Sequence, residues 1–378
     1  MKKQFYLVKR ILVLYLLFLL PICLFSNEFA LYYTVRDSVQ IGFFGAPYAS
    51  YSSETSFSLG LSLLLFEKNQ KATIIAGQDF NLRADVRYSF EDEREYFIEG
   101  RIPFRRFQQV LNTKLEYKIS PRSFYGIGGD TSDENKISYR REQYRFLADW
   151  TKIFKNAMSV GVSFDLSGYE NTNIVQNSEF GVQSSELLGF DHFYRAIGIG
   201  PMFLYNTKTP KNYPLSGMMY KNEILFYQKT YGSDFNFMTM EQDFHYFHRL
   251  NFQKDHIIAA QIVSLNTFGE TPFHYLSELG SGNMMRGLPT GRYIDEHLLA
   301  TQVEYRSPLI FRRISAVCFV STGLVYNSIN DFVSDNLHFT GGAGLRFALD
   351  KQERVNVRAD IGISSEGNQI YLKFGEVF

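Results

Sequence analysis

The 378-residue chain carries 39 basic and 39 acidic side chains, so its formal net charge of zero gives no argument for a nucleic acid or an anionic surface as a partner. Aromatic residues make up 16% of the chain, yet the mean hydropathy is −0.18, which excludes a helical membrane protein. A transmembrane β-barrel has this composition because only alternate residues face lipid. A large soluble β protein is the alternative.

The N-terminal segment has the pattern of an export signal. Residues 1–10 are basic, residues 11–20 form an apolar run that Pro21 ends, and Ser26 is a small residue suited to cleavage before Asn27. This pattern predicts a Sec signal peptide over residues 1–26. A membrane anchor is the alternative, but the apolar run is short for a membrane span.

The first half of the remaining chain alternates between apolar and polar residues. Apolar Leu82 and Val86 alternate with Arg83, Asp85 and Arg87. Charged residues on the second face are incompatible with lipid or a dry core, whereas a water-filled lumen accommodates them. The pairing of the strands in residues 91–120 is left open. The strands expected in this half cover residues 39–46, 57–65, 80–90, 96–104 and 110–119.

The second half continues the same pattern. Met158 and Val162 lie on one face of a strand and Ser159, Ser163 and Asp165 on the other. Residues 155–157 form a tight turn, and the polar residues 171–186 form an exposed loop. The total of about 16 strands predicts an all-β fold, a transmembrane antiparallel β-barrel. The further strands expected cover residues 138–154, 158–168, 192–205, 218–227, 236–249, 256–265, 299–306, 315–326, 339–349, 355–364 and 369–378.

A glycine-rich loop at about residues 268–295 separates the eleventh and twelfth of these strands. It carries Met285-Arg286-Gly287-Leu288, and the next strand carries Glu304 shortly before Pro308. This combination resembles the BamA/TamA family of bacterial outer-membrane barrels, also called the bacterial surface antigen family. In that family an extracellular loop with a (Val/Leu)-Arg-Gly-(Phe/Tyr) motif folds back into the lumen. The resemblance implies that the loop of this chain does the same.

The resemblance extends over the mature chain, residues 27–378. Further similar segments are the Phe-Tyr-Gly-Ile-Gly sequence at 124–128 and the segments 342–347 and 358–362. The last expected strand, with Phe374 and Phe378 on one face, resembles the signal that the barrel-assembly machinery reads. The resemblance therefore implies that this machinery inserts the chain.

The resemblance also implies an acidic partner for Arg286. Glu304 is the first candidate, because it shares the inward face of its strand with Arg306. The family offers a second acid in a Phe-x-Asp-x-Gly pattern, where this chain has Ser321, so Asp360 is a further candidate. The alternative is that Arg286 is a solvated residue on an external loop.

No residue pattern predicts catalysis, a metal site or a cofactor. There is no Gly-x-Ser-x-Gly motif and no pair of catalytic carboxylates stands out. His245 and His248 are three residues apart on a strand, so they point to opposite faces and cannot share an ion. We therefore expect that the protein is not an enzyme.

Members of the resembled family insert outer-membrane proteins or pass unfolded polypeptides across the outer membrane. They carry polypeptide-transport (POTRA) domains before the barrel, and here too few residues precede the first expected strand to form one. We therefore expect a stand-alone barrel in the outer membrane of a diderm bacterium, with membrane lipid and a separate periplasmic partner but no nucleic acid. A passive or gated pore for small solutes is the alternative, and a purely structural barrel is a third reading. The sequence leaves open the client or solute and whether the lumen is plugged.

Overall fold

A computed structural model describes residues 40–68, 80–154, 157–175, 187–210, 213–251, 254–328, 336–350 and 355–378. The predicted signal peptide at residues 1–26, part of the predicted turn (155–156) and part of the predicted loop (176–186) lie outside the described residues. No helix in the described ranges is long and apolar enough to cross a membrane.

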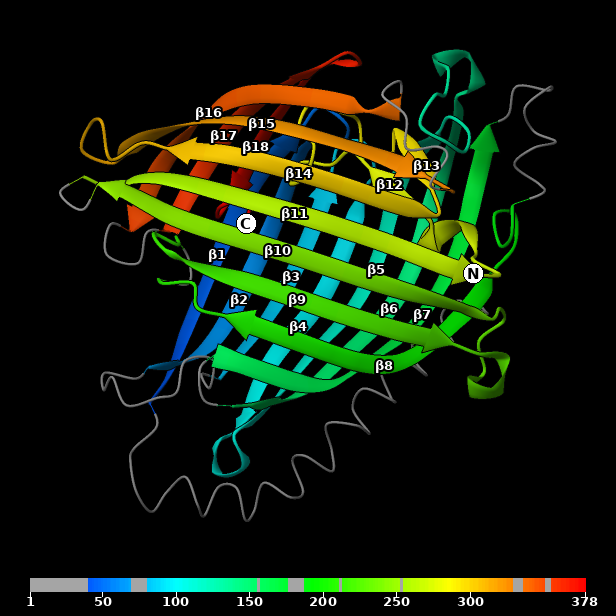
Figure 1. Ribbon diagram of the computed structural model, residues 1–378, viewed down its shortest axis with the longest axis horizontal. Helices are drawn as coiled ribbons and strands as arrows, with labels where there is room; N and C mark the ends of the chain where they lie inside the picture. Colours follow the sequence, from blue (N-terminus) through cyan, green and yellow to red (C-terminus); the bar gives the residue numbers. More distant parts are fainter. Residues whose placement is uncertain are drawn as a thin grey trace.

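Sixteen antiparallel strands close into one barrel, which confirms the predicted fold class (Figure 1). Each barrel strand pairs with its neighbours in the chain, with two exceptions: β11 pairs with β14, because β12 and β13 lie in the intervening loop, and β1 pairs with β18 to close the barrel. The barrel strands are β1 (Gln40–Ser52), β2 (Ser56–Lys68), β3 (Asn81–Ser89), β4 (Arg94–Phe104), β5 (Gln109–Phe124), β6 (Ile137–Ile153), β7 (Met158–Val175), β8 (Tyr194–Asn206), β9 (Gly217–Tyr227), β10 (Phe237–Asn251), β11 (His256–Gly269), β14 (His297–Arg306), β15 (Ile314–Tyr326), β16 (His338–Asp350), β17 (Val355–Ser364) and β18 (Gly367–Phe374).

Several strand boundaries differ from those expected: β1, β5 and β11 run on to Ser52, Phe124 and Gly269, beyond the expected residues 46, 119 and 265. β7 runs to Val175, into the segment 171–186 that polarity alone assigned to a loop, because Thr172 and Val175 still pair with β6. β18 ends at Phe374, before the expected residue 378. The structure also resolves the pairing left open in residues 91–120: β3, β4 and β5 are consecutive antiparallel neighbours.

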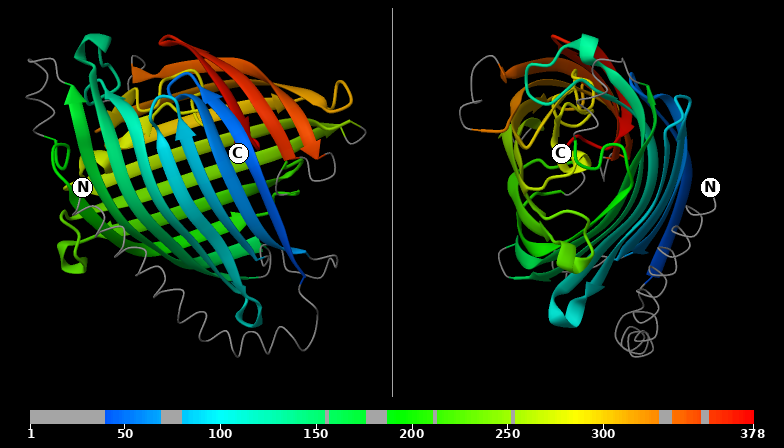
Figure 2. Two further views of the ribbon diagram at one scale, coloured as in Figure 1. Left: turned by 180° about the vertical axis from the view of Figure 1, so that it is seen from behind. Right: turned by 90° about the vertical axis from the view of Figure 1, so that its right-hand side faces the viewer.

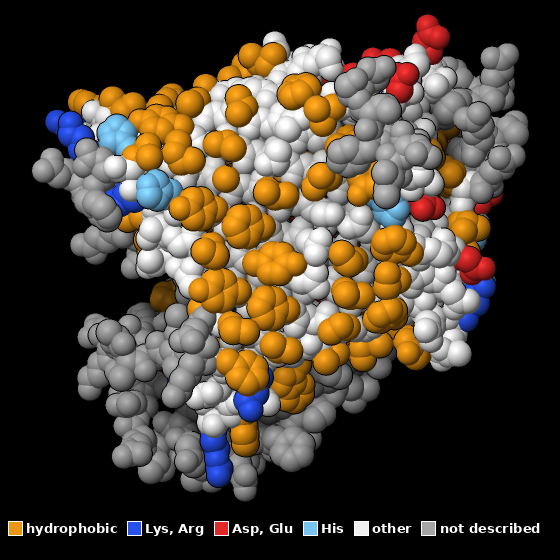
Figure 3. Space-filling model, viewed as in Figure 1, with side chains coloured by type: hydrophobic (Ala, Val, Ile, Leu, Met, Phe, Trp, Pro, Cys, Tyr) orange, Lys and Arg blue, Asp and Glu red, His pale blue; other side chains and the backbone are white. Residues whose placement is uncertain are grey.

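The two faces of the sheet differ in the way that the alternation predicts. Val160 and Val162 are 47% and 49% exposed, whereas Ser163 and Asp165 are 1% and 0% exposed. Apolar side chains are spread over the outer surface (Figure 3). Because the outward face is apolar and every strand has a neighbour on each side, the wall meets the requirements for a sheet in lipid except along the short β1–β18 seam.

The two ends of the barrel differ in their connections. One end, called here the turn end, has five connections of four to seven residues, 105–108, 154–157, 252–255, 307–313 and 351–354, beside the longer 69–80 and 207–216. The other, called the loop end, has the two longest connections, 176–193 and 270–296, with 125–136, 228–236 and 327–337, beside the short 53–55, 90–93 and 365–366. Outer-membrane barrels place short turns in the periplasm and long loops outside the cell. The turn end is therefore the periplasmic end.

Candidate functional site

The connection between β11 and β14, residues 270–296, lies inside the barrel and is called here the lumen loop. Viewed along the barrel, it is the yellow segment within the ring of strands (Figure 2, right). It contains the short 3-10 helix η5 (Phe273–Tyr275) and an antiparallel pair of short strands, β12 (Ser277–Leu279) and β13 (Tyr293–Asp295). Its apolar side chains Leu279, Met285 and Leu288 are fully buried against the wall. The loop therefore packs on the wall as part of the folded core.

Two glycines bring the tip of the lumen loop against β17. Gly287 has φ +117, and a Cβ atom there would lie 2.8 Å from the backbone nitrogen of Ile363. On the wall, a Cβ atom at Gly362 would lie 2.5 Å from the backbone carbonyl carbon of Arg286. Only glycine tolerates both the positive φ and this approach of two backbones. The Arg-Gly pair thus places the Arg286 side chain at a defined point of the lumen.

Arg286 bridges two strands that are distant in the sequence. Its Nη2 donates to Glu304 Oε2 of β14 at 2.6 Å, and its Nη1 donates to Asp360 Oδ2 of β17 at 3.0 Å. Its Cζ atom lies 3.4 Å from the centre of the Phe319 ring. Arg286, Glu304 and Asp360 side chains are all 0% exposed. Charge-assisted hydrogen bonds of this kind are the strong ones, so the loop tip is clamped to the wall.

Three further arginines surround the same acids. Arg306 Nε lies 2.7 Å from Glu304 Oε1, and Arg346 Nη1 and Arg358 Nη1 lie 2.5 Å and 3.1 Å from the two Asp360 oxygens. Arg346 also donates to Glu376 at 2.8 Å. The cluster, called here the arginine cluster, therefore holds four arginines and three acidic side chains, and the oxygen of Phe378 also accepts from Arg306 at 3.2 Å. Its members are Arg286, Arg306, Arg346, Arg358, Glu304, Asp360 and Glu376.

The three candidate partners of Arg286 have different outcomes. Glu304 and Asp360 both accept hydrogen bonds from it, whereas the buried Ser321 hydroxyl has no hydrogen-bond partner among the described residues. The second carboxylate thus comes from β17 and not from β15. Phe319, two residues before Ser321, contributes its ring face instead.

Backbone hydrogen bonds extend the clamp on both sides of Arg286. Gln302 Nε2 donates to the carbonyl of Asn283 at 2.9 Å, and Arg358 Nη2 donates to the carbonyl of Gly282 at 3.1 Å. The Ser364 hydroxyl donates to the carbonyl of Gly287 at 2.8 Å. The tip is therefore held by its backbone as well as by one side chain.

A second anchor holds the base of the lumen loop to the opposite wall, and no residue pattern in the sequence indicated it. His274 Nε2 lies 2.8 Å from Asn171 Oδ1 of β7, and its Nδ1 lies 3.0 Å from the Tyr194 hydroxyl of β8. The Arg141 guanidinium of β6 donates to Glu278 Oε1 at 2.6 Å. The lumen loop consequently spans the barrel between β6–β8 and β14–β17.

The electrostatics of this second anchor set the protonation of its groups. Burial alone would raise the pKa of Glu278, but the positive charges of Arg141 and Arg122 outweigh burial and hold it at about 2. Burial lowers the pKa of His274 well below its usual value, and the same two arginines lower it further. Glu278 is thus ionised and His274 neutral at physiological pH.

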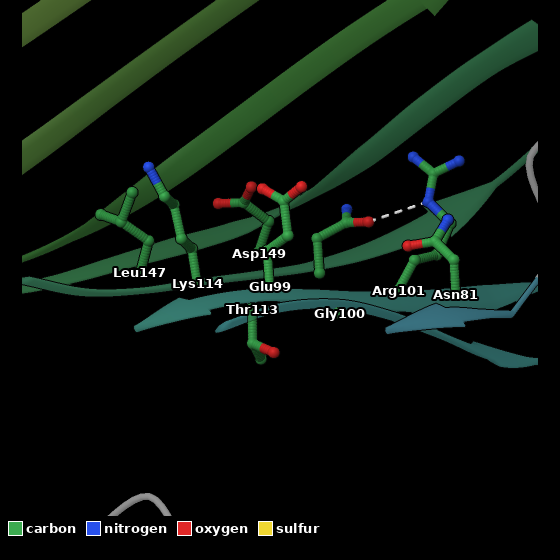
Figure 4. A pocket seen from close by; sticks show the side chains of 9 residues that line it. Asn81, Glu99, Gly100, Arg101, Thr113, Lys114, Leu147 and Asp149 are labelled. Atoms are coloured by element: carbon green, nitrogen blue, oxygen red, sulfur yellow. Dashed lines mark hydrogen bonds between the residues drawn. The ribbon is translucent and has the colours of Figure 1, made fainter. Parts of the chain in front are cut away.

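The lumen near the turn end contains a polar cavity of about 310 Å³. Four charged side chains lie on the same side of the sheet, those of Lys114, Asp149, Glu99 and Arg101, whereas Thr113 points to the other side (Figure 4). Arg101 Nε donates to Asn112 Oδ1 at 3.0 Å. Both signs of charge therefore line the cavity.

The chain end does not place its two aromatic residues on one face, so that expectation was wrong. Phe374 faces outward and is 47% exposed. Phe378 lies on the lumen side, with its ring centre 5.8 Å from that of Phe247 and its carbonyl accepting from Arg306 at 3.2 Å. The strand stops because Gly375, with φ +80, turns the chain inward. Whether Phe374 and Phe378 form an assembly signal stays a prediction.

The barrel closes through one short seam, between β1 and β18. Only Tyr51↔Leu372 and Ser52↔Tyr371 are in register there, whereas β1 pairs with β2 from Gln40↔Lys68 to Ser52↔Ser56. Among the described residues, none pairs with the second edge of residues 40–50. This segment therefore presents unpaired backbone groups next to the lipid face.

Fold and site together define a class: a sixteen-stranded membrane barrel whose lumen holds an inward-folded loop with a buried Arg-Gly tip. The sequence matches the Omp85 superfamily domain over residues 65–368, so the chain belongs to this superfamily of outer-membrane barrels. A comparison with curated proteins finds no match.

Solved structures show the same fold at low sequence identity. BamA from Haemophilus ducreyi, lacking POTRA domains 1–3, is 14% identical with a TM-score of 0.59, and the match covers 89% of this chain and 70% of that one. CdiB from Acinetobacter baumannii is 11% identical with a TM-score of 0.55, covering 89% and 60%. CdiB from Escherichia coli is 9% identical with a TM-score of 0.55, covering 88% and 67%.

Proposed function

We propose that this barrel assists the insertion or translocation of polypeptides at the outer membrane, and that the β1–β18 seam is where a client strand pairs. The observation that carries the proposal is the seam itself, with two residue pairs in register and residues 40–50 of β1 unpaired on one edge within the described chain. In lipid each unsatisfied backbone group costs several kcal/mol. An incoming β-strand satisfies these groups by adding to the edge.

The lumen loop favours a role in polypeptide insertion or translocation rather than a role as a wide pore. It is anchored at Arg286 on one wall and at His274 and Glu278 on the other, so it crosses the path that a solute would take. A pore for solutes remains the second candidate, because the cavity of about 310 Å³ is lined by charged side chains. Bilayer conductance separates the two: a steady, large conductance of the unmodified protein favours the pore, and rare openings favour the plugged barrel.

Locking the seam tests the proposal directly. In a Cys318→Ser background, Tyr51→Cys and Leu372→Cys place two thiols at residues that are in register across the seam. We expect that oxidation stops assisted folding of a second barrel into liposomes and that reduction restores it. The matched control, Val303→Cys with Val320→Cys, locks β14 to β15, where pairing is already continuous. Equal activity of the oxidised seam variant and its reduced form would exclude the seam as the insertion site.

The role of a separate periplasmic partner, the need for the assembly machinery and the absence of an enzymatic activity stay predictions. A pull-down from native envelopes, followed by protein identification, tests the first two.

A further inference from the structure

The exposed charges of the barrel are sorted between its two ends. The loop end exposes mainly acids and the turn end only cations, among the side chains that the structure describes. The exposed acids of the loop end are Glu91, Asp130, Asp133, Glu134, Asp191, Asp234 and Glu270, and its exposed cations are Lys136, Arg195 and Lys229. The exposed cations of the turn end are Arg106, Lys152, Lys254, Arg312 and Arg313. A net charge of zero therefore conceals a strongly polarised molecule.

On the face drawn in Figure 3, the acids lie toward the right and upper right, where the loops are. Most of the basic side chains lie toward the left and lower edges. Because the two groups are at opposite ends of the barrel, each end presents its own charge to whatever surrounds it.

At the turn end, cations alternate with exposed aromatic rings around the connection from β4 to β5 and the end of β6. Phe107, Trp150 and Phe154 are 58%, 52% and 46% exposed. Arg106 lies over the Phe107 ring at 5.8 Å and Lys152 over the Phe154 ring at 5.7 Å. These five residues are called here the basic aromatic patch.

The patch belongs to the lipid-facing side of the wall. Lys152 is in register with Val160 of β7, which is 47% exposed, and Trp150 is in register with Val162, which is 49% exposed. Trp150 also stacks on Phe104, with ring centres 5.7 Å apart. Aromatic rings at this depth mark the boundary between hydrocarbon and headgroups, and a lysine beside them extends its ammonium group to the headgroup level.

We propose that the basic aromatic patch selects anionic glycerophospholipids from the membrane leaflet at the turn end. The two cations supply the phosphate contacts, and the three rings cover the adjoining acyl chains. Each Lys or Arg near an anionic surface strengthens association about fivefold at moderate ionic strength. A lipid is favoured over an acidic protein because Trp150 and Lys152 project from the face that lipid covers, which a periplasmic protein does not reach. The proposal needs only the membrane location and not the proposed role in insertion.

The chain contains its own probe for this site, since Trp150 is its only tryptophan. Brominated lipids quench tryptophan on contact, so the fluorescence of Trp150 reports the lipids beside the patch. We expect brominated phosphatidylglycerol to quench at least threefold more efficiently than brominated phosphatidylcholine at equal mole fraction in mixed vesicles. High salt should reduce this preference, because it screens the cations.

Two variants of equal charge change give the test its specificity. Arg106→Gln with Lys152→Gln should bring the preference close to one, whereas Arg195→Gln with Lys229→Gln at the loop end should leave it unchanged. Lys152→Gln alone should reduce the logarithm of the quenching preference by about half. This single variant replaces the double variant if the latter does not fold. Equal quenching by both lipids in the unmodified protein overturns the proposal. The cations of the turn end would then be assigned to an acidic protein partner. A preference that survives in the correctly folded double variant overturns it as well.

Discussion

Replacing Asp360 by Asn should weaken the barrel more than replacing Arg286, although Arg286 belongs to the recognised motif. Asp360 accepts from Arg286 at 3.0 Å, from Arg346 at 2.5 Å and from Arg358 at 3.1 Å. Asp360→Asn removes a buried negative charge and leaves these three buried guanidinium groups around a neutral amide.

The two substitutions differ in the free energy of unfolding that they remove. Removing one partner of a buried ion pair costs about 3–5 kcal/mol, which we expect for Asp360→Asn. Arg286→Gln leaves both acids paired instead, because Glu304 keeps Arg306 at 2.7 Å and Asp360 keeps Arg346. Its cost should be about 1.5–3 kcal/mol, the net contribution of a charge-assisted hydrogen bond.

The assay is denaturant unfolding in detergent micelles, and the fraction of folded protein is measured by the gel mobility of unheated samples. Asp234→Asn, an exposed acid at the loop end, is the control and should change stability by less than about 0.5 kcal/mol. Arg286→Gln should raise bilayer conductance, since it removes the side-chain contacts of the tip of the lumen loop without unfolding the wall. An Asp360→Asn variant as stable as Arg286→Gln would refute the pairing deduced for the cluster.

Three further predictions concern the loop base, the wall and the loop tip. The free energy of unfolding that Glu278 contributes is complete above pH 4.5 and is lost as the pH falls toward about 2, because the carboxyl takes up its proton at a higher pH in the unfolded chain than in the folded one. Unfolding measured as a function of acid pH checks this, and Glu278→Gln should remove the dependence. Val162→Arg should cost about 2–4 kcal/mol in the free energy of folding into the membrane and lower the yield of assembled barrel, whereas Ser163→Arg places its side chain in the lumen and should cost much less. Equal yields of the two variants would contradict the assignment of the two faces. Gly362→Ala should displace the loop tip and raise conductance, while Gly341→Ala, where a Cβ meets nothing closer than 3.5 Å, should not.

The alternation of apolar and polar residues was sufficient to predict the barrel. Because side chains along a strand alternate between its two faces, the sequence alone assigns Val162 to the outward face and Ser163 to the lumen face. The strand count follows from the same local signal. The lumen loop and its pair Arg286-Gly287 were found through their resemblance to the family motif, and the structure shows that Gly287 has the positive φ that glycine tolerates.

Register and long-range closure lie beyond such local signals. Asp360 meets Arg286 and Ser321 does not, because the shear of the closed sheet sets which inward residues share a level of the lumen. The contact of His274 with Asn171 depends on how the loop crosses the barrel, which no spacing in the chain encodes.

The chain end shows the same division. The period of two predicted one face for Phe374 and Phe378, but β18 loses its partner at the short seam, and the residues after Gly375 leave the strand. Phe378 then packs on Phe247 and under the Arg306 guanidinium, groups that only the closed barrel brings within reach. The residue pattern by itself therefore determined which residues face lipid, and the family resemblance indicated which loop enters the lumen. Tertiary structure alone decided which charges meet there, because ion pairs join residues that only barrel closure brings to the same level.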